Sequence, residues 1–300
     1  MNESVTRSGY VALIGRPNVG KSTLLNALVG QKVSIVSPKP QTTRHRIVGI
    51  LNGPGFQAAF LDTPGLHAGS RRRLNQAMNR AAMSSLADAD LLLLVVDALR
   101  WTDEDAMVLE RVRESGKPAV LVVNKADQVK PRERLLPTLE RLSAMLDFEA
   151  VIPVSALKRH NLDRLVAVLP SLLPEGEPFY PPEQVTDRSE RFLAAEIVRE
   201  KLTRVLREEL PYGLTVEIER WQEEDDGRLA IGAIIWVERE GQRRIVIGEG
   251  GQGLKEVGRA ARLDINRMLG RRIHLELWVK VREHWADSEA ALRQFGYDSG

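Results

Sequence analysis

A glycine-rich segment near the N-terminus has the residue types that bind phosphate. It reads Gly-Arg-Pro-Asn-Val-Gly-Lys-Ser at residues 15–22, between an apolar run at 10–14 and a helix-like run at 23–29. A strand, a glycine loop and a helix in this order form a P-loop, whose backbone N–H groups face phosphate. Lys21 would reach the β- and γ-phosphates, and the Ser22 hydroxyl would bind Mg²⁺. A glycine-rich turn without a ligand is the alternative.

A second motif, Asp-Thr-Pro-Gly at residues 62–65, follows the apolar run 58–61. An Asp at a strand end can hold Mg²⁺ through water. The N–H of Gly65 can approach a γ-phosphate because no side chain intervenes. Taken alone, this pattern is also a common turn.

Two more motifs have the chemistry to read a guanine base. Asn-Lys-Ala-Asp at residues 124–127 follows the run 119–123, and Ser-Ala-Leu at 155–157 follows the run 151–154. The Asp127 carboxylate can accept hydrogen bonds from guanine N1–H and the 2-amino group, whereas adenine would leave it unpaired. Asn124 can tie this loop to the P-loop, Lys125 can lie over the ring, and the N–H of Ala156 can donate to guanine O6.

The order and spacing of these four motifs resemble a translation-factor-class GTPase. In that resemblance, Pro-Gln-Thr-Thr-Arg-His at residues 40–45 is switch I, and Thr43, or else Thr42, completes the Mg²⁺ shell. The implied catalytic residues are Lys21, Thr43 and Gly65, and the implied Mg²⁺ site is Ser22, Thr43 and Asp62. The implied GTP-binding residues are Gly15, Arg16, Pro17, Asn18, Val19, Gly20, Lys21, Ser22, Thr23, Asp62, Thr63, Pro64, Gly65, Leu66, Asn124, Lys125, Ala126, Asp127, Ser155, Ala156 and Leu157.

Two residues bear on the rate of GTP hydrolysis. Leu66 stands where Ras-like enzymes carry the glutamine that orients water, so we expect slow intrinsic turnover. Asn18 lies in the P-loop, where an Asn in a related subset of GTPases helps to bind K⁺. We therefore expect stimulation by K⁺, and the alternative is that Asn18 stabilises the loop by a side-chain-to-backbone hydrogen bond.

Alternating strand-like and helix-like segments would bring these motifs together. The strand-like runs are residues 10–14, 47–51, 58–61, 91–96, 119–123 and 151–154, and amphipathic stretches lie between them. This alternation predicts an α/β fold with a doubly wound, mostly parallel sheet. Ligands in such sheets bind at the carboxyl ends of the strands, which is where the motifs fall.

Composition is that of a globular protein with a core in each of two domains. The 300 residues are 43% hydrophobic and 28% charged, and they include no cysteine, which excludes disulfides and cysteine-based metal sites. The N-terminus lacks the apolar core of a signal peptide, and the longest apolar run is residues 91–96, so we expect a cytoplasmic protein.

The net charge is only +2, but residues 243–282 hold ten Arg or Lys and four Asp or Glu. This asymmetry indicates a polyanionic partner or, alternatively, a solvated charged surface.

A proline-rich segment divides the chain. Residues 173–187 contain four prolines, which predicts an extended linker between a GTPase domain at 9–172 and a second domain at 188–300. The second domain reads as helix (189–210), strands (214–221 and 230–237), a further strand-like run (243–247), helix (252–269) and strand (273–281), with a tail that can form another helix. We expect Trp221, Trp236, Trp278 and Trp285 to lie in its core.

A glycine loop enters the basic helix of this second domain. Gly248, Glu249, Gly250 and Gly251 form a Gly-x-x-Gly sequence, and in this order of elements it resembles a type II KH domain, whose loop clamps a nucleic-acid backbone. Glu249 departs from the basic residue usual in such loops and would repel phosphate. Affinity would then come from the neighbouring cations. The candidate RNA-binding residues are Gly248, Glu249, Gly250, Gly251, Arg243, Arg244, Lys255, Arg259 and Arg262.

A GTPase domain followed by a KH domain resembles the Era family, which belongs with the TrmE, EngA, EngB and septin-like GTPases. The resemblance implies a monomeric GTPase that uses GTP, GDP and Mg²⁺, binds the 3′ end of 16S rRNA and the 30S subunit, and acts in small-subunit maturation. It also implies peripheral association with the cytoplasmic face of the membrane. Two alternatives are an RNA-binding assembly module whose nucleotide site is structural, and a GTPase that docks on a protein through its basic face.

Overall fold

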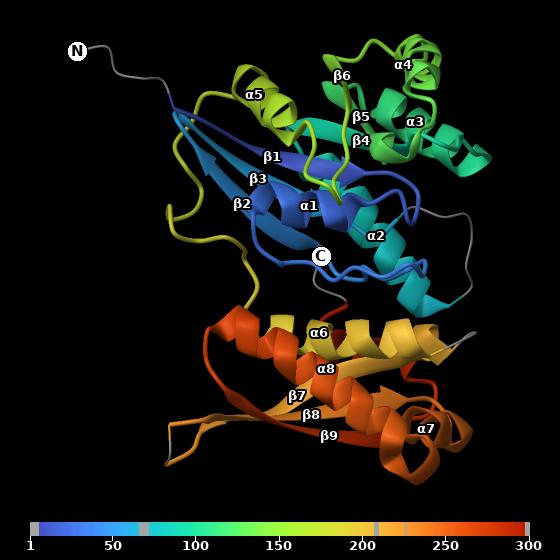
Figure 1. The fold of residues 1–300 in the computed structure, drawn as a ribbon, viewed down its shortest axis with the longest axis vertical. Helices are drawn as coiled ribbons and strands as arrows, with labels where there is room; N and C mark the ends of the chain where they lie inside the picture. Colours follow the sequence, from blue (N-terminus) through green and yellow to red (C-terminus); the bar gives the residue numbers. More distant parts are fainter. Residues whose placement is uncertain (1–5, 66–71, 207–209, 226, 298–300) are drawn as a thin grey trace.

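The computed structural model describes residues 6–65, 72–206, 210–225 and 227–297. It has two units, one stacked on the other, and a long extended segment runs down one side to join them (Figure 1). The first unit holds the nucleotide motifs, and the second holds the basic helix.

The first unit is a six-stranded sheet with helices on both faces (Figure 1). The strand order is β2-β3-β1-β4-β5-β6, and all described pairs are parallel except β2 with β3. This confirms the predicted doubly wound, mostly parallel sheet. Its elements are β1 (Arg7–Ile14), α1 (Lys21–Val29), β2 (Ile47–Gly53), β3 (Phe56–Asp62), α2 (Arg73–Asp88), β4 (Leu91–Asp97), α3 (Asp103–Ser115), β5 (Ala119–Asn124), the 3₁₀ turns η1 (Ala126–Gln128) and η2 (Arg132–Arg134), α4 (Leu135–Ser143), β6 (Ala150–Pro153) and α5 (Leu162–Leu172).

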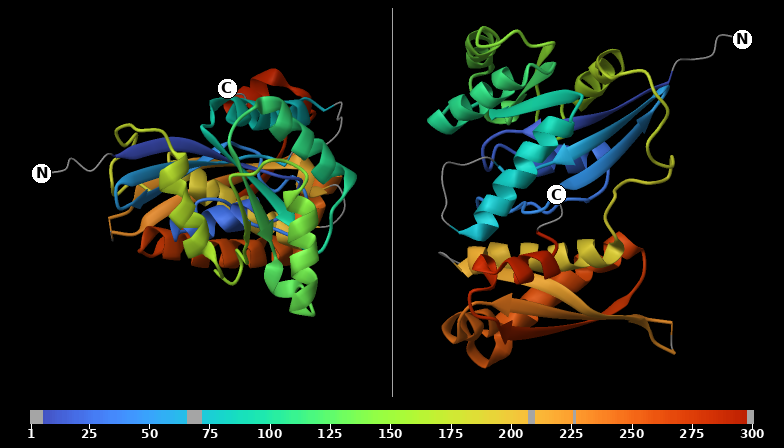
Figure 2. Two further views of the ribbon diagram at one scale, coloured as in Figure 1. Left: turned by 90° about the horizontal axis from the view of Figure 1, so that it is seen from above. Right: turned by 180° about the vertical axis from the view of Figure 1, so that it is seen from behind.

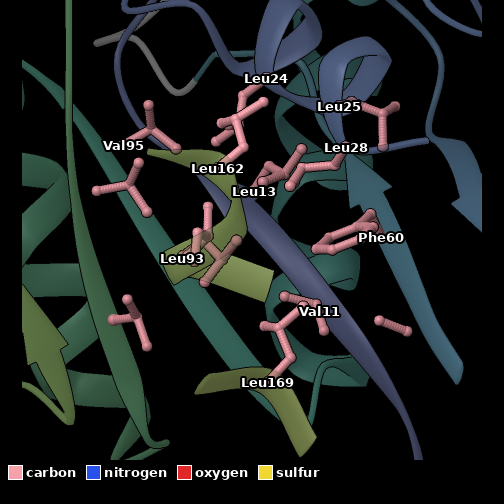
Figure 3. Close-up of a cluster of buried hydrophobic side chains, with 14 of the residues drawn as sticks. Val11, Leu13, Leu24, Leu25, Leu28, Phe60, Leu93, Val95, Leu162 and Leu169 are labelled. Atoms are coloured by element: carbon pink, nitrogen blue, oxygen red, sulfur yellow. The ribbon is translucent and has the colours of Figure 1, made fainter. Parts of the chain in front are cut away.

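Each face of this sheet buries its own apolar cluster because the central strands are apolar on both sides. On one face, leucines of α1 and α5 pack against β1, β3 and β4, as Figure 3 shows for Leu24, Leu162 and Phe60. On the other face, Val108 of α3 and Leu142 of α4 cover the alternate residues of the same strands. Two covered faces hold the carboxyl ends of the strands at one edge, where the motif loops begin.

The proline-rich segment 173–187 has no helix and lies along the β2–β3 side of the first unit. The side chain of Gln57, which is buried in β3, accepts hydrogen bonds from the N–H groups of Phe179 and Tyr180, at 2.7 and 3.0 Å. Phe179 stacks on Tyr10 with ring centroids 4.9 Å apart. The segment is therefore extended, as its prolines predict, but it is fastened to the sheet.

The second unit places helices on one face of a three-stranded sheet of order β7-β8-β9 (Figure 1). β7 and β8 are antiparallel, and β8 and β9 are parallel. The elements are α6 (Glu190–Val205), η3 (Leu210–Gly213), β7 (Leu214–Glu223), β8 (Leu229–Val237), α7 (Glu240–Ile247), η4 (Glu249–Gly251), α8 (Gln252–Leu269), β9 (Ile273–Val281), η5 (Trp285–Asp287) and α9 (Glu289–Gln294).

The expected strand at residues 243–247 is wrong, because these residues belong to helix α7. Both edges of β8 are already paired, with β7 and β9, so no central position remains for another strand. Gln242 also caps a helix here, since its side-chain oxygen accepts from the N–H groups of Glu238 and Arg239, at 2.8 and 3.1 Å. The expected helix in the tail is confirmed as α9.

The tryptophans divide between core and surface. Trp285 is fully buried, as expected, whereas Trp278 is 41% exposed on β9, so its predicted core position is wrong. Trp278 lies over Gly232, where a Cβ atom would come within 3.0 Å of the indole ring. Trp221 and Trp236 are partly buried.

Candidate nucleotide site and nucleic-acid groove

The P-loop connects β1 to α1 at the carboxyl edge of the sheet, and its two glycines are required by the space around them. A Cβ on Gly15 would lie 2.4 Å from the carbonyl oxygen of Val95. A Cβ on Gly20 would lie 2.3 Å from Nδ2 of Asn124, and Gly20 also has a φ of +104°. Glycine is therefore needed at both ends of the loop.

Lys21 begins α1 and points back into the loop. Its Nζ donates to the carbonyl oxygens of Gly15 and Arg16, at 2.7 and 3.0 Å. Burial lowers the pKa of Lys21 from 10.5 to about 8, and the Asp62 carboxylate opposes this effect. A phosphate bound in the loop would find a pre-positioned cation.

Three side chains form a site with the donors that Mg²⁺ prefers. Ser22 Oγ and Thr43 Oγ1 are 2.8 Å apart, and fully buried Asp62 accepts a hydrogen bond from Ser34 Oγ at 2.7 Å. Burial raises the pKa of Asp62, and its Oδ1 has no hydrogen-bond partner among the described residues. Two hydroxyls beside a carboxylate with a spare oxygen fit a hydrated Mg²⁺ ion.

The choice between the two threonines of switch I is clear from their hydroxyl partners. Thr42 Oγ1 lies 2.6 Å from Ser37 Oγ and donates to the carbonyl oxygen of Lys39 at 2.7 Å. Thr43, in contrast, faces Ser22. The geometry therefore favours Thr43 as the Mg²⁺ ligand.

The base-reading motifs meet at the ends of β5 and β6. Asn124 Nδ2 donates to the carbonyl oxygen of Val19 at 2.8 Å, which ties this loop to the P-loop as expected. Lys125 Nζ donates to the carbonyl oxygen of Asn18 at 2.9 Å and pairs with Asp97 at 2.7 Å. These contacts hold the two loops around one opening.

The structure gives the N–H of Ala156 another partner than the one we expected. This N–H donates to Asn124 Oδ1 at 3.0 Å and is buried. Asn124 can bond both loops at once because its amide has a donor and an acceptor. A contact of Ala156 with guanine O6 would have to share this hydrogen bond.

A cavity of 460 Å³ lies between the P-loop, switch I and the two base-reading loops. This size suits a nucleotide. Its wall contains the predicted residues Pro17, Asn18, Gly20, Lys21, Ser22, Thr23, Thr43, Thr63, Gly65, Asn124, Lys125, Asp127, Ser155 and Leu157. The predicted residues that do not line the cavity are Gly15, Arg16, Val19, Asp62, Pro64, Ala126 and Ala156, and Leu66 lies outside the described residues.

Sequence reasoning missed part of the cavity wall. Residues 35–39 and Gln41 come from the segment before β2, and Arg204 comes from α6 of the second unit. Arg204 donates to the carbonyl oxygen of Val36 at 2.8 Å. Gln41 lies within the switch I segment but was not singled out, whereas no motif marks residues 35–39, and only the docking of the second unit brings Arg204 here.

Asn18 contacts the same segment. Its φ is +65°, and its Nδ2 donates to the carbonyl oxygen of Pro38 at 3.0 Å. This hydrogen bond is of the side-chain-to-backbone kind that was the alternative to K⁺ binding. It does not lie within the P-loop, because it joins the P-loop to the chain that leads into switch I.

A groove in the second unit runs beside the glycine loop. Gly248, Gly250 and Gly251 have φ values of +75°, +56° and +79°, so each needs the freedom of glycine. The groove has a volume of 580 Å³, with cationic side chains from α8 and apolar ones from β9. Its walls are Gly251, Leu254, Lys255, Gly258, Arg259, Arg262, Leu275 and Leu277.

The other candidate RNA-binding residues lie outside this groove. Arg243 and Arg244 are on α7, and Arg243 pairs with Glu240 at 3.0 Å. Glu249 and Gly250 belong to the exposed loop before α8. An apolar floor with a cationic rim suits single-stranded nucleic acid, because bases need apolar contact and phosphates need cations.

The GTPase and KH assignments are both supported by family comparisons. Residues 10–125 match the family described as 50S ribosome-binding GTPase, and residues 209–286 match the KH domain family. The chain is 56% identical over 292 residues to GTPase Era of Xanthomonas axonopodis pv. citri, and over 290 residues to GTPase Era of Stenotrophomonas maltophilia. Both alignments cover 97% of this chain and 97% of the relative.

Solved structures agree over both units. The chain superimposes with a TM-score of 0.93 and 42% identity on an Era variant from Aquifex aeolicus bound to GDP·AlF₄⁻. It has the same score and identity against Era in complex with MgGDPNP and nucleotides 1506–1542 of 16S ribosomal RNA. Each match covers 97% of this chain and 99% of the other.

Proposed function

The chain belongs to the Era family of GTPases, and from that premise we propose that it binds the 3′ end of 16S rRNA through its KH groove and acts in maturation of the 30S subunit. The observation that carries this proposal is the groove between α8 and β9, with Lys255, Arg259 and Arg262 along an apolar floor. The related Era in complex with MgGDPNP and nucleotides 1506–1542 of 16S ribosomal RNA supports the choice of RNA.

We propose roles in GTP hydrolysis for the residues of the 460 Å³ cavity. Lys21 binds the β- and γ-phosphates, and the Gly65 N–H contacts the γ-phosphate. Ser22, Thr43 and Asp62 hold Mg²⁺, which neutralises phosphate charge as hydrolysis proceeds. Asp127 selects guanine by accepting two hydrogen bonds from its N1–H and 2-amino group. The remaining GTP-binding residues shape the loops.

We also propose that K⁺ stimulates hydrolysis through Asn18. A cation beside the transferred phosphate can act where other GTPases use an arginine finger, which is worth about 10³–10⁵ in rate. The Asn18 side chain lines the cavity and bonds the carbonyl oxygen of Pro38, so its amide oxygen remains for a cation. Equal single-turnover rates in K⁺ and Na⁺ would contradict this proposal, as would an unaffected Asn18→Ala variant.

The RNA proposal is tested by binding to a single-stranded RNA with the sequence of the 16S 3′ end. The double variant Lys255→Ala/Arg259→Ala should weaken binding, and the slope of log affinity against log salt should fall by about two because two phosphate contacts are lost. Arg164→Ala on α5 is the matched control, since Arg164 is an exposed arginine far from the groove in sequence and on the other unit. Unchanged binding by the double variant would contradict the groove assignment.

The alternatives are separated in the same preparation. A structural nucleotide site predicts no single-turnover hydrolysis with or without this RNA. Docking on a protein through the basic face predicts no RNA affinity. Crosslinking to RNA with a GTP analogue and with GDP then shows whether the nucleotide controls RNA binding.

We further propose a cytoplasmic location with peripheral membrane association, for which the family resemblance is the support. No helix within the described residues is long and apolar enough to cross a bilayer. Sedimentation with vesicles of anionic lipid tests the association, and protein that stays in the supernatant at low salt would contradict it.

A further inference from the structure

Switch I is held from both sides by the second unit. The carbonyl oxygen of Thr42 accepts a hydrogen bond from Arg199 Nη2 on α6. On the other side of Thr43, Arg44 donates to the carbonyl oxygens of Leu214 and Pro211, each at 2.7 Å. In Figure 1 the chain that leads into β2 runs along the top of α6. The residue that faces Ser22 therefore lies between two inter-unit attachments.

Both arginines are buried, so water does not compete for these hydrogen bonds. Arg199 is 1% exposed and Arg44 is 3% exposed. A buried guanidinium that bonds a carbonyl oxygen is costly to disturb, since a charge would be left without its partner.

Arg199 is itself fixed by its own helix. Its Nε and Nη2 donate to the two carboxylate oxygens of Glu196, at 2.7 and 2.6 Å. The same Nη2 also reaches Thr42, so one planar group joins α6 to switch I. Only the fork of an arginine can make these contacts together, because the ammonium of a lysine is a single point.

We propose that Arg199 and Arg44 are positioning residues for GTP hydrolysis, which hold Thr43 where it completes the Mg²⁺ shell only while the KH unit is docked. This inference rests on the proposed role of Thr43 as a Mg²⁺ ligand. It assigns part of the GTPase site to the second unit, although neither arginine touches the nucleotide cavity. Loss of either arginine should weaken the binding of Mg²⁺ and of the γ-phosphate, because the two arginines hold switch I and not the base-reading loops.

The test is the Mg²⁺ dependence of nucleotide release in the full chain. The probes are fluorescent, non-hydrolysable GTP and fluorescent GDP, each displaced by excess unlabelled nucleotide over a range of Mg²⁺ concentrations. For Arg199→Lys, the Mg²⁺ concentration that half-maximally slows release of the GTP analogue should rise about tenfold, the loss expected for one charge-assisted hydrogen bond. Release of GDP should be unchanged.

Arg191→Lys is the matched control. Arg191 is an exposed arginine on the same helix, and its Nη2 donates to the carbonyl oxygen of Ile218 inside the second unit. Its Mg²⁺ dependence should equal that of the unmodified chain. Arg44→Lys is the second test variant, since it loosens the other attachment and leaves the Glu196 pair intact.

Thr43→Ala separates a failure of this inference from a failure of the proposed site. If Thr43→Ala does not change the Mg²⁺ dependence, Thr43 is not the ligand and the proposed site is wrong. If Thr43→Ala raises the Mg²⁺ requirement but Arg199→Lys and Arg44→Lys do not, the positioning role is wrong. If one arginine variant also releases GDP faster, its fold is disturbed. The other arginine variant then tests the positioning role.

Discussion

Among single residues, the nucleotide site contains ionisable groups with shifted pKa values and side chains whose hydrogen bonds fix their orientation. Asn124 uses its amide twice, to the carbonyl oxygen of Val19 and to the N–H of Ala156. Lys21 is a buried cation among carbonyl oxygens. Groups that the fold holds in fixed positions need little reordering to bind a nucleotide, which lowers the cost of binding.

Asp127→Asn should exchange guanine for xanthine specificity. In the proposed role the carboxylate would accept from guanine N1–H and the 2-amino group, whereas an amide would accept from N1–H with its oxygen and donate from its NH2 to the xanthine 2-carbonyl. We expect GTP affinity to fall at least about a hundredfold and XTP affinity to rise, on the scale by which lost polar pairing discriminates ligands. Competition of GTP and XTP against a fluorescent nucleotide measures both changes, and a variant that keeps its preference for GTP would contradict the assignment.

GTP binding should take up a proton at alkaline pH. Burial lowers the pKa of Lys21 to about 8, and a bound polyphosphate would raise it by favouring the ammonium. Lys21 is already charged at pH 7, so it adds no pH dependence there, and the affinity should fall as the pH rises above 8. Calorimetry at pH 8.5 in two buffers of different ionisation enthalpy measures the uptake, and equal binding enthalpies in the two buffers would argue against it.

At the scale of elements, the carboxyl ends of parallel strands collect motifs that are far apart in the chain. The extended segment 173–187 matters as well, because it sets where the second unit begins. Gln57 fixes this segment with its whole amide, since its Nε2 also donates to the carbonyl oxygen of Tyr180 at 2.8 Å and to Asn52 Oδ1 at 2.7 Å.

Gln57→Leu should destabilise the protein by about 1–3 kcal/mol, because it removes the hydrogen bonds of a buried side chain to part-buried backbone groups. The residue is 1% exposed, and its loss strands the N–H groups of Phe179 and Tyr180. Glu175→Ala is the control, since its exposed ion pair with Arg7 is worth less than about 1 kcal/mol. Urea unfolding compares the two variants, and equal losses of unfolding free energy would contradict the role of Gln57.

In the whole molecule, switch I and helix α2 lie between the two units. Leu74 and Met78 of α2 pack against Trp285 and Leu292, and Figure 2 shows from behind how the C-terminal elements lie below α2. His45, the last residue of switch I, stacks on Tyr297 with ring centroids 4.3 Å apart. A nucleotide that reshapes switch I or moves α2 must therefore disturb this interface.

Acid should weaken the interface through His45. Its Nδ1–H donates to the carbonyl oxygen of Gly296 at 3.1 Å, and burial lowers the pKa of His45 from 6.5 to about 4 despite the nearby Glu196 carboxylate. The folded protein favours the neutral form of His45. The contribution of His45 to the free energy of unfolding is therefore fully present above pH 6.5, and it is lost as the pH falls toward 4, by up to about 1.4 kcal/mol per pH unit. The positive charges of Arg199 and Arg188 also lower the pKa of His45 and so add to the penalty on its charged form.

The measurement is urea unfolding between pH 7 and pH 5. His45→Gln keeps a hydrogen-bond donor but cannot be protonated, so its unfolding free energy should fall less steeply with acid than that of the unmodified chain. Equal slopes would exclude His45 as the source.

The GTPase fold was predictable from the sequence, and its motifs supply most of the residues proposed for the nucleotide site. Motifs such as Asp62–Gly65 and Asn124–Asp127 follow apolar strands, and a parallel sheet brings strand ends together whatever the details of packing. The order of helices and strands in the KH domain could also be predicted from the sequence around Gly248–Gly251. The exception is α7, which was predicted as a strand although β7 and β9 already pair with both edges of β8.

The contacts between the two units could not be predicted from the sequence. Arg199, Arg44 and Arg204 belong to no motif, and their contacts depend on how α6 docks against switch I. The hydroxyl of Thr43 is distinguished from that of Thr42 only by its direction in space. The periodicity of apolar residues in the sequence predicts single helices and strands. A contact between domains depends instead on packing and on charges that are far apart in the chain, so no spacing in the sequence predicts such a contact.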